Sequence, residues 1–195
     1  MDSVSMDNHR AGYLATRHLI GLGHRRIGYV SGATPTMSRR DRLDGYRQAL
    51  ADADIAVDPA LIAAGDSAIG SDDTHAAEHG RAAAHNLLRL ADPPTGLVAL
   101  NDMHAIGACA AVRDRGRSIP DDVSIVGIDD IPLAGLLYPA LTTVHQPIDK
   151  LSVAAVDLLS KRRGCNDASA TRHIVLDPHL VVRASAAAPR KRRKR

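Results

Sequence analysis

Short apolar runs alternate with longer amphipathic stretches along most of this chain. The clearest apolar runs are residues 27–30, 97–100 and 123–128. The stretches between such runs place apolar side chains at helical spacing, as Leu14, Leu19 and Leu22 show. This alternation is typical of the strands and crossover helices of a parallel β-sheet, so the pattern predicts an α/β fold.

The expected elements follow one another without an internal repeat or a long linker. Helices are predicted over residues 10–22, 41–53, 76–90, 104–115 and 148–159. Strands are predicted over residues 27–30, 61–64, 97–100, 123–128, 141–144, 174–176 and 180–182. Gly23 stands just after the first helix, in the position where many helices end on a glycine with positive φ.

Polar pairs directly follow two of the predicted strands. Asn101-Asp102 comes after residues 97–100, and Asp129-Asp130 comes after residues 123–128. Open α/β sheets bind ligands in the crevice outside the carboxyl ends of their strands. The spacing therefore predicts a polar cleft at this edge of the sheet.

A run of six basic residues, Arg190 to Arg195, dominates the charge of the chain. The formal net charge is +3, so removing these six positive charges leaves −3 on residues 1–189. We interpret residues 187–195 as a disordered basic tail, because runs of like charge repel one another into extended segments. The alternative is a contact between this tail and nucleic acid or an acidic partner. The charge of the folded part gives little support for nucleic-acid binding.

The sequence shows neither a membrane segment nor a redox or metal pattern. No apolar stretch approaches the roughly 20 residues needed to cross a bilayer, and the first residues do not resemble a secretion signal. We therefore expect a cytoplasmic protein. Cys109 and Cys165 lack metal-binding spacing and are expected to be a buried apolar residue and a loop thiol.

Catalytic motifs are weak in this sequence. His75-Ala76-Ala77-Glu78-His79 matches the H-x-x-E-H pattern of one class of zinc proteases. Glu78 is the only glutamate of the chain, so the second glutamate ligand of that pattern is absent, although His85 or an aspartate would be a substitute. Phosphate-binding and dinucleotide-binding glycine motifs are also absent. We expect no enzyme activity, no bound metal and no cofactor.

Five segments together resemble the LacI/GalR family of bacterial transcription regulators. They occur in the family's order and extend over nearly everything from Val4 to Arg183. The segments are Leu19-Ile20-Gly21-Leu22-Gly23-His24-Arg25-Arg26-Ile27, Arg42-Leu43-Asp44-Gly45-Tyr46, Leu100-Asn101-Asp102, the run from Ile119 to Asp130, and Pro139-Ala140-Leu141-Thr142-Thr143-Val144.

The resemblance implies a periplasmic-binding-protein-like fold in which a ligand lies between two lobes. Against that pattern, residues 6–144 correspond to a complete second lobe. Residues 145–186 correspond to a return segment that belongs to an incomplete first lobe, whose apolar faces should lack part of their cover. The DNA-binding headpiece of the family is expected to be absent, which would make this chain truncated at its N-terminus.

The resemblance also assigns ligand-binding residues by position in the matching segments. They are Arg42, Asn101, Asp129 and, as a weaker match, Gln146. A guanidinium fork, a carboxylate and amides are suited to hold hydroxyl groups by directional hydrogen bonds. Asn101 has the alternative role of capping the helix that follows it, but we expect Asp102 to be the cap.

The predicted function is that of the effector-sensing part of a LacI-type regulator. The partners implied are a small polar effector, a second copy in a homodimer, and DNA only through the headpiece. Phe and Trp are absent, so the preference for a sugar comes from the resemblance alone, and a purine or another polar metabolite stays open. A stand-alone sugar-binding protein and a nonfunctional truncated relic are the alternatives.

Overall fold

Fifteen helices and strands make up the described part of this chain. The computed structural model describes residues 2–32, 36–64, 75–164 and 171–190. Its strands are β1 (Ser3–Met6), β2 (Ile27–Val30), β3 (Ile62–Ala63), β4 (Gly96–Ala99), β5 (Ser124–Asp129), β6 (Thr142–His145), β7 (His173–Leu176) and β8 (His179–Val181). Its helices are α1 (Asn8–Gly21), α2 (Met37–Ala51), the 3-10 helix η1 (Pro59–Leu61), α3 (Ala76–Leu88), α4 (Asp102–Asp114), α5 (Pro132–Leu136) and α6 (Ile148–Gly164).

The larger of two sheets has the strand order β3-β2-β4-β5-β6-β8. Its first five strands are parallel, and β8 pairs antiparallel with β6. The chain runs from β2 outward to β3 and then returns to β4 on the other side of β2. The order of the strands therefore reverses between β2 and β4, which is where parallel sheets of this kind form a ligand crevice.

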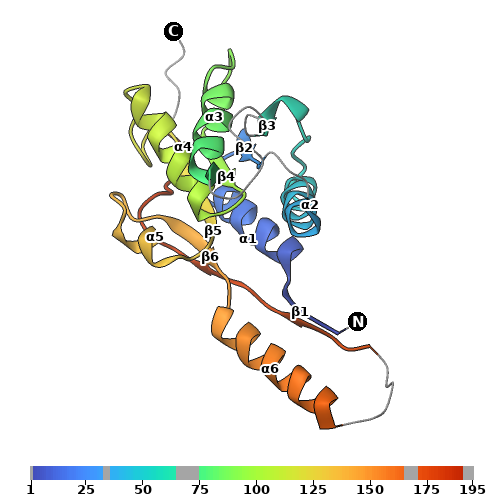
Figure 1. The fold of residues 1–195 in the computed structure, drawn as a ribbon. Helices are drawn as coiled ribbons and strands as arrows, with labels where there is room; N and C mark the ends of the chain where they lie inside the picture. The colour runs from blue at the N-terminus through green and yellow to red at the C-terminus, as the bar shows by residue number, and fades with distance from the viewer. Residues whose placement is uncertain (1, 33–35, 65–74, 165–170, 191–195) are drawn as a thin grey trace.

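Helices cover both faces of this sheet (Figure 1). Buried residues of α1 and α2 form one core with Tyr29, Val98 and Val126, and buried residues of α3 and α4 form another with Leu97 and Ile125. Strands β2 and β4 are buried along their whole length. This double burial explains why their sequences are continuous apolar runs, and it confirms the predicted α/β architecture.

Glycines let the two helices on each face approach closely. A Cβ atom added to Gly12 of α1 would lie 1.9 Å from the Arg42 carbonyl oxygen on α2, and one added to Gly45 would lie 2.0 Å from the His9 carbonyl oxygen. Gly107 makes the equivalent contact on the other face, where an added Cβ would lie 1.8 Å from the Ala77 oxygen. The α1–α2 contact thus fixes the backbone of Arg42 directly.

We expect Gly12→Ala to destabilise the fold by about 3 kcal/mol, because the added methyl group forces α1 away from α2. Gly21 at the end of the same helix has open space around it and provides the matched control. Gly21→Ala should leave stability unchanged or raise it by up to about 1 kcal/mol, through helix propensity. Urea unfolding of both variants measures the difference. Equal effects at the two positions would refute the close-contact interpretation.

The smaller sheet pairs β1 with β7 in parallel, and α6 packs against both strands. Figure 1 shows this unit set apart from the larger sheet. Four apolar side chains of α6 are exposed: Ile148, Val153, Val156 and Leu159.

Two predictions about the C-terminal part of the chain are wrong. We assigned both late strands to the incomplete lobe, but β8 extends the larger sheet, since β6 offers it a free edge. Residues 187–190 are not a disordered tail, because the Ala187 backbone bonds to Ser124 Oγ and to a His24 ring nitrogen. Residues 191–195 lie outside the described part.

Burial makes the Cys109 thiol unreactive. Cys109 is 4% exposed and reduced, and burial raises its pKa to about 11, which keeps the thiol protonated at neutral pH. This agrees with the prediction of a buried apolar residue, whereas Cys165 lies outside the described residues. No helix within residues 2–32, 36–64, 75–164 and 171–190 has both the length and the apolar character that crossing a bilayer requires.

Candidate functional site

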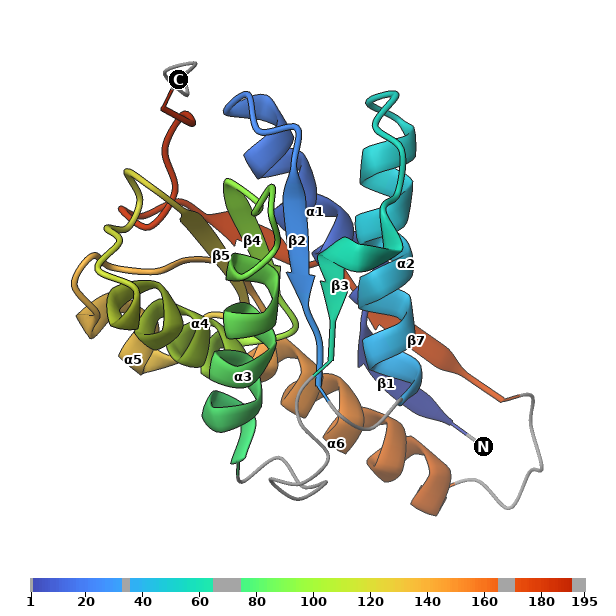
Figure 2. The ribbon, with the colours of Figure 1, turned by 90° about the horizontal axis from the view of Figure 1, so that it is seen from above.

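The carboxyl ends of the parallel strands surround a polar cavity of about 290 Å³, which we call the sheet-edge cavity. Figure 2 shows β2 running toward the side of the molecule on which α6 lies, so this edge faces the smaller sheet and its helix. All four residues predicted to bind ligand line this one cavity. Its lining consists of Thr36, Ser38, Arg39, Arg42, Leu100, Asn101, Asp129 and Gln146.

The Arg42 guanidinium is held by three hydrogen bonds to three separate segments. Nε donates to Asn8 Oδ1 at 2.9 Å, Nη1 to the Leu100 carbonyl oxygen at 2.7 Å, and Nη2 to Asp129 Oδ1 at 3.1 Å. The side chain is only 11% exposed. Because a guanidinium has five N–H donors, two remain to bind a ligand from a fixed position.

Asp129 is presented by a strained turn at the end of β5. Asp129 has a φ of 121° and Asp130 a φ of 58°, and both values lie in the region that favours glycine. Strain of this kind is retained mostly at functional positions. Burial raises the pKa of Asp129, and the neighbouring Arg42 charge partly offsets that effect. The result is a partly buried carboxylate that has one charged partner and an exposed fraction of 23%.

Asn101, not Asp102, caps helix α4, so our assignment of the cap was wrong. Asn101 Oδ1 accepts from the His104 backbone N–H at 3.0 Å, and it also lies 2.6 Å from His104 Nδ1. Asn101 nevertheless lines the sheet-edge cavity. The capping role occupies its oxygen, which leaves the amide N–H groups as the part of this side chain that is suited to a ligand.

Asp102 instead turns inward and supports the turn that carries Asp129. Its carboxylate accepts from the Ile131 backbone N–H at 2.9 Å and from Thr143 Oγ1 at 2.5 Å. Burial raises its pKa to about 6, although these two hydrogen bonds oppose the increase. Gly127 provides the space, since a Cβ there would lie 2.2 Å from Asp102 Oδ1.

Asp130, the second aspartate of the turn, faces away from the predicted ligand residues. Its carboxylate pairs with Arg183 at 2.6 Å and with His145 Nδ1 at 2.9 Å. Burial acts to raise the pKa of Asp130, but the hydrogen bonds from these two residues lower it overall. Asp130 thus joins the end of β5 to the ends of β6 and β8, and only Asp129 faces the cavity.

A second cavity of about 450 Å³ adjoins the first, and we call it the crossover cavity. It shares Ser38, Arg42 and Gln146 with the sheet-edge cavity. The rest of its lining comes from β1, the start of α1, and α6: Val4, Ser5, Met6, Asn8, Leu151, Ser152 and Ala155. The two cavities together form a cleft between the larger sheet and the smaller one.

Sequence reasoning missed the lining residues Thr36, Ser38 and Arg39. We placed the start of α2 at Asp41, whereas the helix begins at Met37 with Thr36 as its cap. Thr36 Oγ1 accepts from the Arg39 backbone N–H at 3.3 Å. A threonine followed by helix-forming residues is a recognisable cap signal, and it would have brought both hydroxyl side chains to the site.

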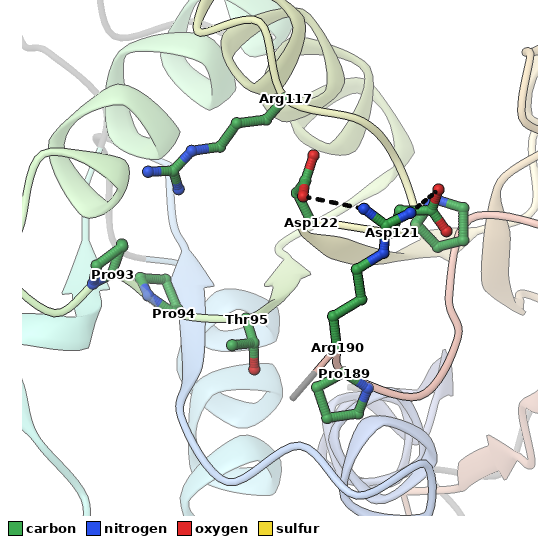
Figure 3. Close-up of a pocket in the computed structure, with 9 residues that line it drawn as sticks. Pro93, Pro94, Thr95, Arg117, Asp121, Asp122, Pro189 and Arg190 are labelled. Carbon is green, nitrogen blue, oxygen red and sulfur yellow. Dashed lines mark ion pairs between the residues drawn. The ribbon is translucent and has the colours of Figure 1, made fainter. Parts of the chain in front are cut away.

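A third cavity, of about 290 Å³, lies at the opposite edge of the sheet and differs in character. Arg190 pairs there with Asp121 at 2.7 Å and with Asp122 at 3.6 Å. Figure 3 shows Arg190 between these carboxylates, with Pro93 and Pro94 on the other side of the cavity. Both acidic side chains pair with an arginine of the same chain, so we interpret the contact as an anchor for the C-terminal segment.

The zinc-protease motif does not form a metal site in the described residues. His79 is 2% exposed, and neither of its ring nitrogens has a hydrogen-bond partner there. His85 pairs instead with Asp114 at 3.1 Å. In the part of the chain that the structure describes, no three His, Cys, Asp or Glu side chains are grouped to hold a metal ion.

Comparison with known proteins places this chain among the periplasmic binding protein-like domains. Residues 16–186 match the family described as periplasmic binding protein-like domain. The chain is 38% identical over 185 residues to the HTH-type transcriptional regulator DegA of Bacillus subtilis, covering 95% of this chain and 52% of DegA. The chain thus spans about half the length of the curated relatives it matches.

Solved structures give the same result. The transcriptional regulator CelR in complex with cellobiose has a TM-score of 0.86 and 33% identity, covering 95% of this chain and 54% of CelR. A LacI family transcriptional regulator from Enterococcus faecium with bound ribose has a TM-score of 0.85 and 32% identity, covering 96% of this chain and 66% of that one.

Proposed function

Because the chain belongs to the periplasmic binding protein-like domains, in the form found in LacI-type transcriptional regulators, we propose that it senses a small polar effector. The preferred class of effector is a sugar, and it is held in the sheet-edge cavity. Arg42 and Asp129 bind its hydroxyl groups, and Asn101 and Gln146 add amide contacts. The observation that carries this proposal is the convergence of these four side chains on one cavity.

The chemistry of the lining favours a hydrophilic ligand held by hydrogen bonds. No tyrosine lines either the sheet-edge cavity or the crossover cavity, and the chain has no Phe or Trp. Stacking on an aromatic ring is therefore not available from the described lining. In the sheet-edge cavity two guanidinium groups, a carboxylate, two amides and two hydroxyls remain, and this set suits a ligand with several hydroxyl groups.

The proposed sensing mechanism is a shift between conformations. A ligand in this cleft contacts the larger sheet through Asp129 and reaches the smaller sheet across the crossover cavity, so it favours arrangements in which both contacts form. In a parent regulator that acts as a homodimer and carries a DNA-binding headpiece, this shift changes the affinity for DNA. The chain itself contributes binding and no catalytic step.

Binding measurements with matched arginine variants test the proposal. D-ribose, cellobiose and hypoxanthine are titrated into the 195-residue chain by calorimetry, and we expect at least one to bind with one-to-one stoichiometry. At 100 times its dissociation constant, the ligand should stabilise the fold by about 3 kcal/mol, measured as a higher melting temperature.

Arg42→Met should abolish this binding, because it removes the two N–H donors that the hydrogen bonds to Asn8, Leu100 and Asp129 leave for a ligand. Arg47→Met is the control, since Arg47 lies on the same helix and pairs with Asp44 at an exposed position. Its affinity should equal that of the unmodified chain. Failure of all three ligands to bind, or equal binding by the Arg42 variant, would reject the proposal.

A further inference from the structure

Asn8 joins Arg42 to residues 6–8, where the chain passes from strand β1 of the smaller sheet to helix α1, which covers the larger sheet. We call residues 6–8 the crossover segment. Strand β1 ends at Met6, and helix α1 begins at Asn8. Asn8 Oδ1 accepts from Arg42 Nε at 2.9 Å, while Asn8 Nδ2 donates to the Met6 carbonyl oxygen at 3.2 Å. One amide group is therefore bonded on one side to the ligand-site arginine and on the other to the end of β1.

This crossover segment is itself fixed to the returning strand of the smaller sheet. The Asp7 backbone N–H donates to the Leu176 carbonyl oxygen at 3.0 Å, at the end of β7. The Asp7 carboxylate accepts from the Arg10 backbone N–H at 2.7 Å and caps α1. Because Asp7 already fills the capping role, the start of α1 does not require the Asn8 side chain.

The other two bonds of Arg42 go to the larger sheet, at Leu100 and Asp129. The guanidinium is planar, so fixing the direction of Nε also fixes the plane in which all the Nη donors lie. Arg42 thus bridges the strand ends of the larger sheet and the crossover at Asn8. A displacement of the crossover changes the plane of the donors that face the sheet-edge cavity.

We propose that Asn8 is a positioning residue, which sets the orientation of the Arg42 guanidinium and couples it to the Asp7–Leu176 junction between the two sheets. Asn8 acts through Arg42 and need not touch a ligand. The coupling works in both directions. If the crossover segment restricts the motion of the Arg42 side chain, then Arg42 restricts the motion of the crossover segment to the same extent in free energy.

The first test measures Arg42 in the ligand-free chain by nuclear magnetic resonance. We expect Asn8→Ala to speed the exchange of the Arg42 Nε proton with water about 10-fold, since a lost hydrogen bond exposes this proton. Asn8→Asp keeps an acceptor oxygen and should restore slow exchange to within about 3-fold. Asn86→Ala, at an exposed position of α3, is the matched control and should have no effect.

The second test measures the reverse direction by amide exchange. Arg42→Met should speed exchange of the Asp7 backbone amide about 3-fold or more, while Arg47→Met should not. A merely structural role of Asn8 would lower the melting temperature and speed exchange throughout α1, without a selective effect at Arg42. That result, or unchanged Arg42 exchange in Asn8→Ala, would overturn the inference. Neither measurement uses a ligand, so their outcome is separate from that of the binding proposal.

Discussion

Asp129→Asn is expected to weaken binding of the tightest ligand among D-ribose, cellobiose and hypoxanthine by about 100-fold. The carboxylate is a charged acceptor, and each hydrogen bond to a charged group contributes about 1.5–3 kcal/mol. Two such bonds, reduced to bonds with a neutral amide, account for a loss of this size. The same change leaves Arg42 without its ionic partner at 3.1 Å, which weakens the fixed placement of the guanidinium.

Asparagine is the appropriate replacement, because it also tolerates the positive φ of 121° at this position better than most residues. Burial raises the pKa of Asp129, which means that the charge is unfavourable for the folded state. A neutral side chain removes that cost, so we expect no loss of thermal stability. The variant therefore separates a binding defect from a folding defect.

Calorimetric titration of Asp129→Asn, with melting curves as the check on folding, measures the effect. Asp121→Asn changes a carboxylate at the opposite edge of the sheet and should bind ligand with unchanged affinity. Unchanged affinity in Asp129→Asn would show that this carboxylate does not contact the ligand.

Local sequence patterns were sufficient to predict the parallel strands of the larger sheet. Strands β2 and β4 are continuous apolar runs because both of their faces are covered, and each stands beside a helix of the alternating pattern, α2 after β2 and α4 after β4. Since parallel strands place their carboxyl ends at one edge, Asn101 and Asp129 could be expected to lie near each other. The structure places both in one cavity with Arg42 and Gln146. Ligand binding by these four residues stays a prediction.

The smaller sheet could not be predicted in this way. Strand β1 is four residues long and pairs with β7, which begins at His173, so no local signal connects the two. The antiparallel pairing of β8 with β6 likewise depends on a free sheet edge, which exists only after the larger sheet has formed. Pairings between segments so distant in sequence are decided by the packed structure.

The exchange of roles between Asn101 and Asp102 has a specific cause. Asparagine and aspartate are both preferred as helix caps, so the local sequence does not distinguish them. The choice depends on Gly127 of β5, which leaves room for the Asp102 carboxylate to lie against Gly127 and accept a hydrogen bond from Thr143 of β6. The information is present in the sequence, but it can be used only after the register of the two strands is known.

The buried Asp102 should produce a distinctive dependence of stability on pH. Its pKa is raised from 3.8 to about 6, so the folded state binds this proton more tightly than the unfolded state does. Between about pH 4 and pH 6 the unfolded state loses the proton first, and the free energy of unfolding therefore falls as the pH rises. Above about pH 6 the full cost of the buried charge, about 3 kcal/mol, is present.

Asp102→Asn should therefore stabilise the chain at pH 7 by about 2 kcal/mol, with the gain disappearing near pH 4. The amide keeps both contacts, because its oxygen accepts from the Ile131 N–H and its nitrogen donates to Thr143 Oγ1. Urea unfolding at pH 4, 5, 6 and 7 measures the difference. A stability gain that is the same at every pH would contradict the assignment to ionisation.

Asp114→Asn is the matched control, for which we expect the opposite change in stability at pH 7. Hydrogen bonding from Arg81 is the main cause that lowers the pKa of Asp114, and His85 adds to it, so the charge of Asp114 favours the folded state above the pKa of the unfolded chain. Its removal should destabilise the chain at pH 7 and have a smaller effect at pH 4. Opposite changes in the stability of these two variants would show that burial makes the Asp102 charge destabilising, whereas ion pairing makes the Asp114 charge stabilising.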